Sequence, residues 1–174
     1  MRRSIVIAFI LGLAVSGSVA LLTRAAPMPP ARPKLHDQIR SLAKLTSLEL
    51  RIDPMDAAIR ETGIESATIH RIWSKRLKEA GFKITEGKGD PVLAFTVSTV
   101  TDKAVPGGIA FNPYLSLSQR VHIDGIEKRL TVPTFVEIIV GLEPRENLGM
   151  GVAQQAERMI GNFIKRWQEA VQRN

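Results

Sequence analysis

Apolar and polar residues alternate with a period of two over residues 46–52, which predicts a strand with one buried face. Its apolar positions are Leu48, Leu50 and Ile52. Over residues 65–80 the period changes to that of an amphipathic helix. The apolar side of this helix comprises Ile69, Ile72, Trp73, Leu77 and Ala80. We expect the helix to end at Gly81, because glycine adopts the left-handed conformation that commonly follows a helix.

A short strand at residues 82–84 and three longer strands follow, at about 93–98, 108–123 and 129–140. The rows that we expect to face the core are Leu93, Phe95 and Val97 in the first long strand, Leu115, Leu117, Val121 and Ile123 in the second, and Leu130, Val132, Val136, Ile138 and Val140 in the third. Asp124-Gly125 favours a hairpin between the second and the third, since this pair tolerates positive φ. The short connections predict an antiparallel meander.

A second amphipathic helix is predicted over residues 150–172. Its apolar stripe consists of Val152, Ala156, Met159, Ile160, Phe163, Trp167 and Val171. Two amphipathic helices and a half-apolar sheet have one simple packing solution, in which both helices cover the same face of the sheet. We therefore predict a single α+β domain over residues 45–174. It is a two-layer sandwich of order β-α-β-β-β-α, with a mostly antiparallel sheet and two helices on one face.

A second group of apolar residues alternates against these core rows. It consists of Phe111, Tyr114, Phe135 and Ile139. If the helices cover only one face of the sheet, this group is expected on the open face, where such a cluster would mark a partner surface. The alternative is a second cover over that face, supplied by the linker or by the 102–108 loop.

The N-terminus has the pattern of an export signal. Met1-Arg2-Arg3 is basic, and the 18 residues from Ile5 to Leu22 carry no charge, a length between a signal-peptide core and a membrane span. Ser18-Val19-Ala20 offers small residues for cleavage. Residues 1–24 are therefore predicted to be a signal peptide or a retained N-terminal membrane anchor, and in both cases the rest of the chain crosses the membrane. We expect a periplasmic protein, or one anchored in the inner membrane that faces the periplasm.

A proline-rich, basic linker is predicted over residues 25–44, because four prolines between Pro27 and Pro33 exclude a helix. The chain carries 24 Lys or Arg residues against 17 Asp or Glu, a net charge of +7. Of this charge, +5 belongs to residues 1–40 and only +2 to residues 41–174. The basic excess thus fits export and contact of residues 1–40 with a membrane, or a solvated spacer, and we predict no nucleic-acid partner.

Two features of the predicted helices are candidates for ligand binding. Arg71, Lys75 and Lys78 form a basic stripe opposite the apolar side of the first helix. The stripe could contact an anionic head group or a polyanionic glycan, or it could be the solvated side of an amphipathic helix. Trp73 and Trp167 lie on the two apolar stripes, in the core or beside a groove that admits an acyl chain.

Patterns for catalysis and metal binding are absent from the sequence. There is no Cys, and the three His stand apart from one another. Gly149-Met150-Gly151 comes nearest to a phosphate loop, but Gln154 stands where the dinucleotide fingerprint has Gly or Ala. We interpret these glycines as a loop and the start of a helix. No catalytic, metal-binding or cofactor-binding residue is predicted, and no cofactor.

The element order resembles that of small periplasmic and outer-membrane lipoproteins of the lipopolysaccharide-assembly type. The likeness rests on an export signal, a strand, a helix that ends in Gly81-Phe82, a three-stranded meander and a long C-terminal helix. That family carries a lipidated cysteine, which this chain lacks, and we carry over no functional residues. The resemblance implies a role in the cell envelope.

The function predicted from these features is that of an exported, non-enzymatic binding module in envelope transport or assembly. Its partner would be an envelope protein, or a lipid or glycan amphiphile. Two alternatives are an enzyme that acts on a cell-wall or polysaccharide substrate and a membrane-tethered structural domain. A polar pocket that unites Arg120, His122 and an acidic residue would favour the enzyme.

Overall fold

The structure is a computed structural model that describes residues 36–173, apart from 88–90, 104 and 126. The predicted leader and the proline-rich stretch up to residue 35 lie outside the described residues, so their predictions stay predictions. Within the described part, no helix is long and apolar enough to span a membrane.

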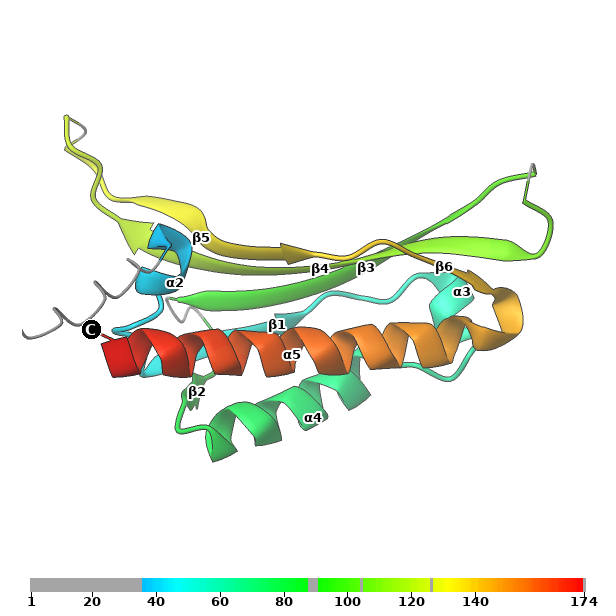
Figure 1. Cartoon of the computed structure of the whole chain (residues 1–174), viewed down its shortest axis with the longest axis horizontal. Coiled ribbons are helices and arrows are strands. Elements are labelled where there is room, and N and C mark those ends of the chain that lie inside the picture. Colours follow the sequence, from blue (N-terminus) through cyan, green and yellow to red (C-terminus); the bar gives the residue numbers. More distant parts are fainter. Residues whose placement is uncertain (1–35, 88–90, 104, 126, 174) are drawn as a thin grey trace, which may run out of the picture. The chain divides into compact units, whose positions relative to one another are not determined.

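Six strands and five helical segments make up the described part (Figure 1). The strands are β1 (Ser47–Ile52), β2 (Lys83–Thr85), β3 (Val92–Thr101), β4 (Gly108–Val121), β5 (Leu130–Ile138) and β6 (Gly141–Pro144). The helical segments are α2 (Asp37–Arg40), α3 (Ala57–Arg60), α4 (Ser66–Glu79), the 3-10 turn η1 (Arg145–Asn147) and α5 (Leu148–Arg173).

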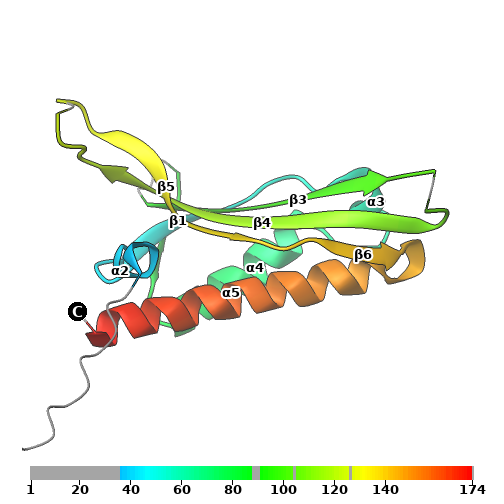
Figure 2. The same ribbon diagram turned by 45° about the horizontal axis from the view of Figure 1, so that its top comes forward.

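The sheet has the order β2-β1-β3-β4-β5, and β6 also pairs with β4. The β1 strand pairs in parallel with β2 and β3, because α4 carries the chain back between β1 and β2. The remaining three pairings are antiparallel. Both long helices, α4 and α5, lie on one side of the sheet (Figures 1 and 2). The predicted α+β fold is confirmed.

Aromatic side chains fill the space between the helices and the sheet. The ring of Trp73 lies 4.7 Å from that of Phe95, so α4 is fixed to β3. Phe163 of α5 lies 5.9 Å from Phe82 and 5.5 Å from Phe135. Trp167 packs on Phe82 and donates a hydrogen bond to the Leu45 carbonyl at 3.0 Å. Both tryptophans therefore belong to the core side, as core packing requires.

The expected core row of β3 is confirmed, since Leu93, Phe95 and Val97 are all buried. The core row expected for β5 is wrong. Phe135 stands directly opposite Leu117, and directly opposed residues share a face, so Phe135 faces the core. Ile138 and Val140, which we expected in the core, are 57% and 76% exposed.

The start of the domain also differs from the expectation. Residues 37–44 were assigned to the linker, but they form α2 and a following turn. Leu42 in this turn is fully buried in the core. Burial of Leu42 and Leu45 fixes this segment to the domain, so residues 37–44 do not form an extended linker.

Candidate functional site

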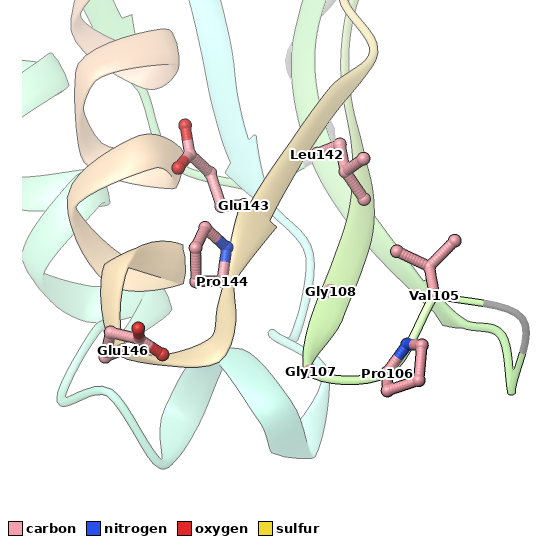
Figure 3. Close-up of a pocket in the computed structure, with 8 residues that line it drawn as sticks. All are labelled: Val105, Pro106, Gly107, Gly108, Leu142, Glu143, Pro144 and Glu146. Carbon is pink, nitrogen blue, oxygen red and sulfur yellow. The ribbon is translucent and has the colours of Figure 1, made fainter.

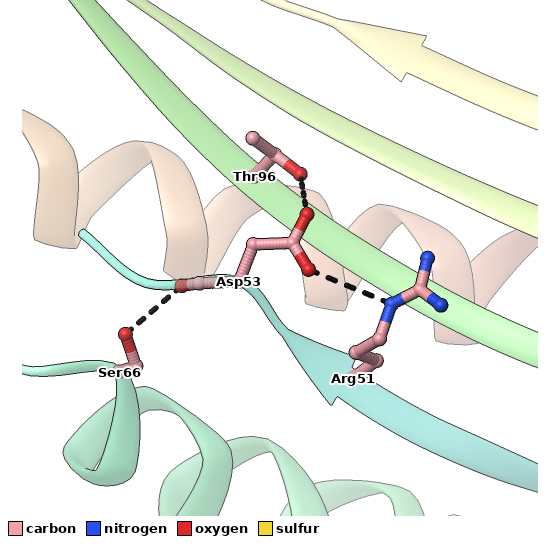
Figure 4. Close-up of polar contacts among 4 residues, drawn as sticks. All are labelled: Arg51, Asp53, Ser66 and Thr96. Carbon is pink, nitrogen blue, oxygen red and sulfur yellow. Dashed lines mark hydrogen bonds and ion pairs between the residues drawn. The ribbon is translucent and has the colours of Figure 1, made fainter. Parts of the chain in front are cut away.

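The open face of the sheet has a polar half over β1 and β3. Thr96 donates a hydrogen bond from Oγ1 to Oδ2 of Asp53 at 2.5 Å, and Nε of Arg51 lies 3.5 Å from Oδ1 (Figure 4). The Ser66 hydroxyl donates to the Asp53 carbonyl at 2.9 Å, which ties the start of α4 to the end of β1. These polar groups bond to one another, so this half of the face offers a partner few free hydrogen-bonding groups.

On the other half, exposed apolar side chains gather along the edge formed by β5 and β6. Ile138 at the end of β5, Val140 in the connection and Leu142 in β6 alternate along the edge and are 57%, 76% and 61% exposed. We call these three residues the apolar row. Val100, which is 66% exposed, lies beside it, because Val100 pairs with Ala110 and Ala110 pairs with Leu142. Contiguous apolar surface of this kind is typical of an interaction site.

The apolar row lies on a sheet edge. Both β5 and β6 pair with β4, and no further strand pairs with them in the described part of the chain. The Ile139 N–H donates to the Pro113 carbonyl at 3.1 Å, so this residue is turned towards β4. Pro113 has no N–H to return, and the side-chain amide of Asn112 donates to the Ile139 carbonyl instead, at 3.1 Å. Because backbone groups alternate in direction, those of the apolar row point away from β4.

A short piece of the same edge is covered by α2. Gln38 donates from Nε2 to the Val136 carbonyl at 3.3 Å, and the Ser41 hydroxyl lies 3.5 Å from the Thr134 carbonyl. These contacts show that the carbonyls of Thr134 and Val136 point outward, away from β4. The cover ends at Val136, just before the apolar row begins.

A cavity of about 450 Å³ adjoins Leu142 at the end of the apolar row (Figure 3). It is lined by Val105, Pro106, Gly107, Gly108, Leu142, Glu143, Pro144 and Glu146. A Cβ built on Gly108 would lie 2.8 Å from Val105 and 3.4 Å from Leu142, so both side chains crowd over this glycine. The cavity extends the apolar surface from the sheet to the loop before β4.

Carboxylates line the helix side of the same edge. Glu137 accepts a hydrogen bond at Oε1 from Asn162 at 2.8 Å, while its Oε2 is buried and has no partner. Glu143 and Glu146 line the cavity, with the Glu143 carboxylate directed toward the helix in Figure 3, and neither has an ion-pair partner among the described residues. The edge is thus apolar on the open face and acidic on the helix face.

The structure places the predicted basic stripe on the exposed side of α4. Arg71, Lys75 and Lys78 lie beside a shallow hollow of about 530 Å³. Lys75 makes only a loose ion pair, 3.9 Å from Glu79, and the other two have no ion-pair partner in the part that the structure describes. The nearby Arg76 lies 2.6 Å from Glu157 of α5 and is therefore engaged.

The predicted partner face is wrong for most of its members. Phe111 and Phe135 are each 2% exposed and belong to the core, and Ile139 packs partly buried against it. Only Tyr114, which stands opposite Ile138, lies on the open face and is half-buried. Phe111 precedes Leu115 by an even number of residues, so strand alternation alone places both on the core face. The exposed residues are instead Val100 and the apolar row.

The residues considered for catalysis lie at the end of β4. Arg120 and His122 are exposed where β4 ends. No group of three His, Asp or Glu residues in the described ranges is arranged to hold a metal ion. Gly149 and Gly151 are buried inside the first turns of α5, so the expectation of a loop there is wrong. A Cβ on Gly149 would lie 2.6 Å from the Thr62 hydroxyl, which explains the small residue by close packing.

No protein-family model and no curated protein matches this sequence. Two solved structures of bacterial lipoproteins are similar to it. Rare lipoprotein B from Shewanella oneidensis is 16% identical over 71% of this chain and 92% of its own, with a TM-score of 0.32. A minor lipoprotein from Acinetobacter baumannii is 11% identical over 73% of this chain and 86% of its own, with a TM-score of 0.26. At these scores neither assigns a family, a ligand or a partner to this chain.

Proposed function

We propose that this chain is an exported, non-enzymatic module of a bacterial cell envelope that binds a partner protein during envelope transport or assembly. It would act in the periplasm, either free or held by its leader in the inner membrane. The observation that carries the proposal is the exposed apolar row, Ile138, Val140 and Leu142, on an unpaired sheet edge.

Two physical arguments support partner binding at this row. Exposed apolar side chains gain free energy when a partner removes them from water, at roughly 25 cal/mol per Å². An uncovered apolar edge strand is also an aggregation hazard that proteins usually suppress with charges or a cover. Here α2 covers Thr134 and Val136 but leaves the next residues open, which favours a reserved binding surface.

Photo-crosslinking in bacterial cells tests this function. A benzoylphenylalanine in place of Val140 is expected to give a discrete adduct with an envelope protein, because this side chain is 76% exposed on the proposed surface. The matched control is the same replacement at Ile72, an exposed apolar residue of α4 that is 44% exposed. Identical adducts from both sites, no adduct from Val140, or recovery of the protein from the cytosol would each overturn the proposal.

A second candidate function, binding of an anionic amphiphile, is favoured by the unpaired charges of Arg71 and Lys78. A basic residue near an anionic membrane surface contributes about 1 kcal/mol to binding. In this case Arg71→Gln should weaken binding to phosphatidylglycerol vesicles about fivefold at low salt, measured by co-sedimentation. Arg76→Gln is the matched control, because Glu157 already engages this guanidinium and the loss should be smaller. Equal losses from both variants, or binding that persists unchanged in 1 M salt, would count against the stripe.

A further inference from the structure

We propose that residues 138–142 accept an added β-strand from the partner protein, and that this strand alternates apolar residues with Lys or Arg. The inference rests on the proposed function and deepens it, because it names how the partner is held and the chemistry of the segment that is held. The strand would extend the sheet beyond β5 and β6.

The first argument is the direction of the backbone groups. Ile139 is turned to β4 by its N–H bond to Pro113, so the N–H and C=O groups of its neighbours Ile138 and Val140 point outward. The hydrogen bonds from Gln38 and Ser41 show the same outward direction two and four residues earlier along β5. An incoming strand would continue this row of bonds where α2 stops.

The second argument is the apolar row. In a sheet, residues directly opposite on neighbouring strands have Cβ atoms about 4.5–5.5 Å apart on the same face. Apolar residues at every second position of the incoming strand would therefore cover Ile138, Val140 and Leu142, which are the most exposed large apolar residues of this edge. The partner strand is therefore expected to carry apolar residues at every second position.

The third argument is charge complementarity on the other face. Glu137 and Glu143 lie at the odd-numbered positions that flank the apolar row, and their side chains are on the helix side of the sheet. One oxygen of Glu137 is buried without a hydrogen-bond donor, and Glu143 has no ion pair within the described residues. Lys or Arg at the alternate positions of the incoming strand would supply the missing donors and opposite charge.

The same residues disfavour a second copy of this chain as the occupant. Antiparallel pairing of two copies about Val140 would place Glu137 opposite Glu143 of the second copy, and like charges directly opposite each other are destabilising. Pairing about Gly141 would place Ile138 opposite Pro144, which has no N–H to donate. In these two registers charge and hydrogen bonding disfavour a second copy, and the acidic side chains of the edge favour a different chain with basic residues.

The test uses the purified full-length protein and a labelled peptide, acetyl-Lys-Val-Lys-Val-Lys-Val-Lys-amide, as the probe in fluorescence anisotropy. We expect saturable binding that weakens about tenfold or more when the lysines are replaced by glutamates. Glu143→Lys in the protein should reverse this preference, whereas Glu79→Lys, on α4 and away from this edge, should not. Unchanged preference in the Glu143→Lys variant would overturn the charge assignment.

Two N-methylated forms of the same peptide separate strand addition from mere apolar contact. Methylation of the valine amides removes the N–H groups that face the edge in an antiparallel strand, and methylation of the lysine amides removes those that face away. One form should lose binding at least tenfold and the other should keep it, with the roles exchanged for a parallel strand. If both forms bind as well as the parent, strand addition is overturned while the apolar row survives as a docking surface.

The last test measures the oligomeric state of the protein in the absence of peptide. Sedimentation velocity should show a monomer at micromolar concentration, in agreement with an edge that disfavours self-pairing. A dimer that Val140→Lys dissociates would overturn the proposal in favour of a second copy. Failure of the peptide to bind, together with a specific crosslink from Val140 in cells, would overturn strand addition and leave the proposed function standing.

Discussion

Replacement of Trp73 by Ala is expected to lower the free energy of unfolding by about 3–5 kcal/mol, a large share of the roughly 5–15 kcal/mol that stabilises a typical domain. The indole is 1% exposed and its ring lies 4.7 Å from that of Phe95, so truncation leaves a cavity between α4 and β3. The surrounding core, which includes Ile69 and Leu77, is held by secondary structure on both sides and closes such a cavity only in part. Urea unfolding followed by far-UV circular dichroism measures the loss.

Ile72→Ala is the control for this variant, because Ile72 is the neighbouring residue on α4 but is 44% exposed. Its expected loss stays below about 1 kcal/mol, since most of its side chain remains in water in the folded protein. Equal losses from the two variants would contradict the packing described for α4.

The second large effect on the free energy of unfolding is expected from replacing glycines of α5 by Ala. The two replacements change this free energy in opposite directions. Gly149→Ala is expected to cost about 1–3 kcal/mol, because the new Cβ would lie 2.6 Å from Oγ1 and 2.8 Å from Cβ of Thr62. Thr62 does not yield easily, since its hydroxyl donates to the Ile59 carbonyl at 2.6 Å. The same urea unfolding measurement applies.

Gly161→Ala in the same helix is the matched control. Its new Cβ would have no atom within 4 Å, so only the higher helix propensity of Ala is felt. The variant should gain up to about 1 kcal/mol. A loss at Gly161, or a gain at Gly149, would contradict the described position of α5 against the segment that follows α3.

Sequence periodicity was sufficient where only one face of an element is apolar. The row Leu93, Phe95 and Val97 was predicted because Thr96 and Ser98 alternate with it, and the apolar stripe of α5, apart from the exposed Val171, because the other side of that helix is polar. The layered architecture followed from these patterns, since amphipathic elements have few ways to bury their apolar sides.

The candidate site could not be predicted in the same way, because β5 is apolar on both faces. Val136, Ile138 and Val140 form one row and Phe135 and Ile139 the other, so alternation carries no information on which row is buried. Pairing with β4 decides it, through the opposition of Leu117 and Phe135 at a register shift. Glu137 and Glu143 could not be linked to a binding site from the sequence, because only the strand pairing shows that both lie along one edge of the sheet.

The N-terminal segment also gave no periodic signal. The α2 helix has only four residues, too few for an amphipathic pattern, and it directly follows a proline-rich stretch. Its attachment depends on contacts that are distant in sequence, such as the bond from Gln38 to Val136, 98 residues away. The sequence around α2 therefore could not predict that this segment packs against β5.

The position of β1 between β2 and β3 has a kinetic consequence. A chain that emerges with its N-terminus first, from a ribosome or a membrane channel, presents α2 and β1 before any strand exists to receive them. The β1 strand gains its first neighbour with β2, which ends at Thr85, and its second with β3, which ends at Thr101, and the α2 segment gains its contacts only with Thr134 and Val136. The sheet therefore closes on both sides of β1 and under α2 only after most of the polypeptide has emerged, so completion of the domain depends on contacts that are distant in sequence.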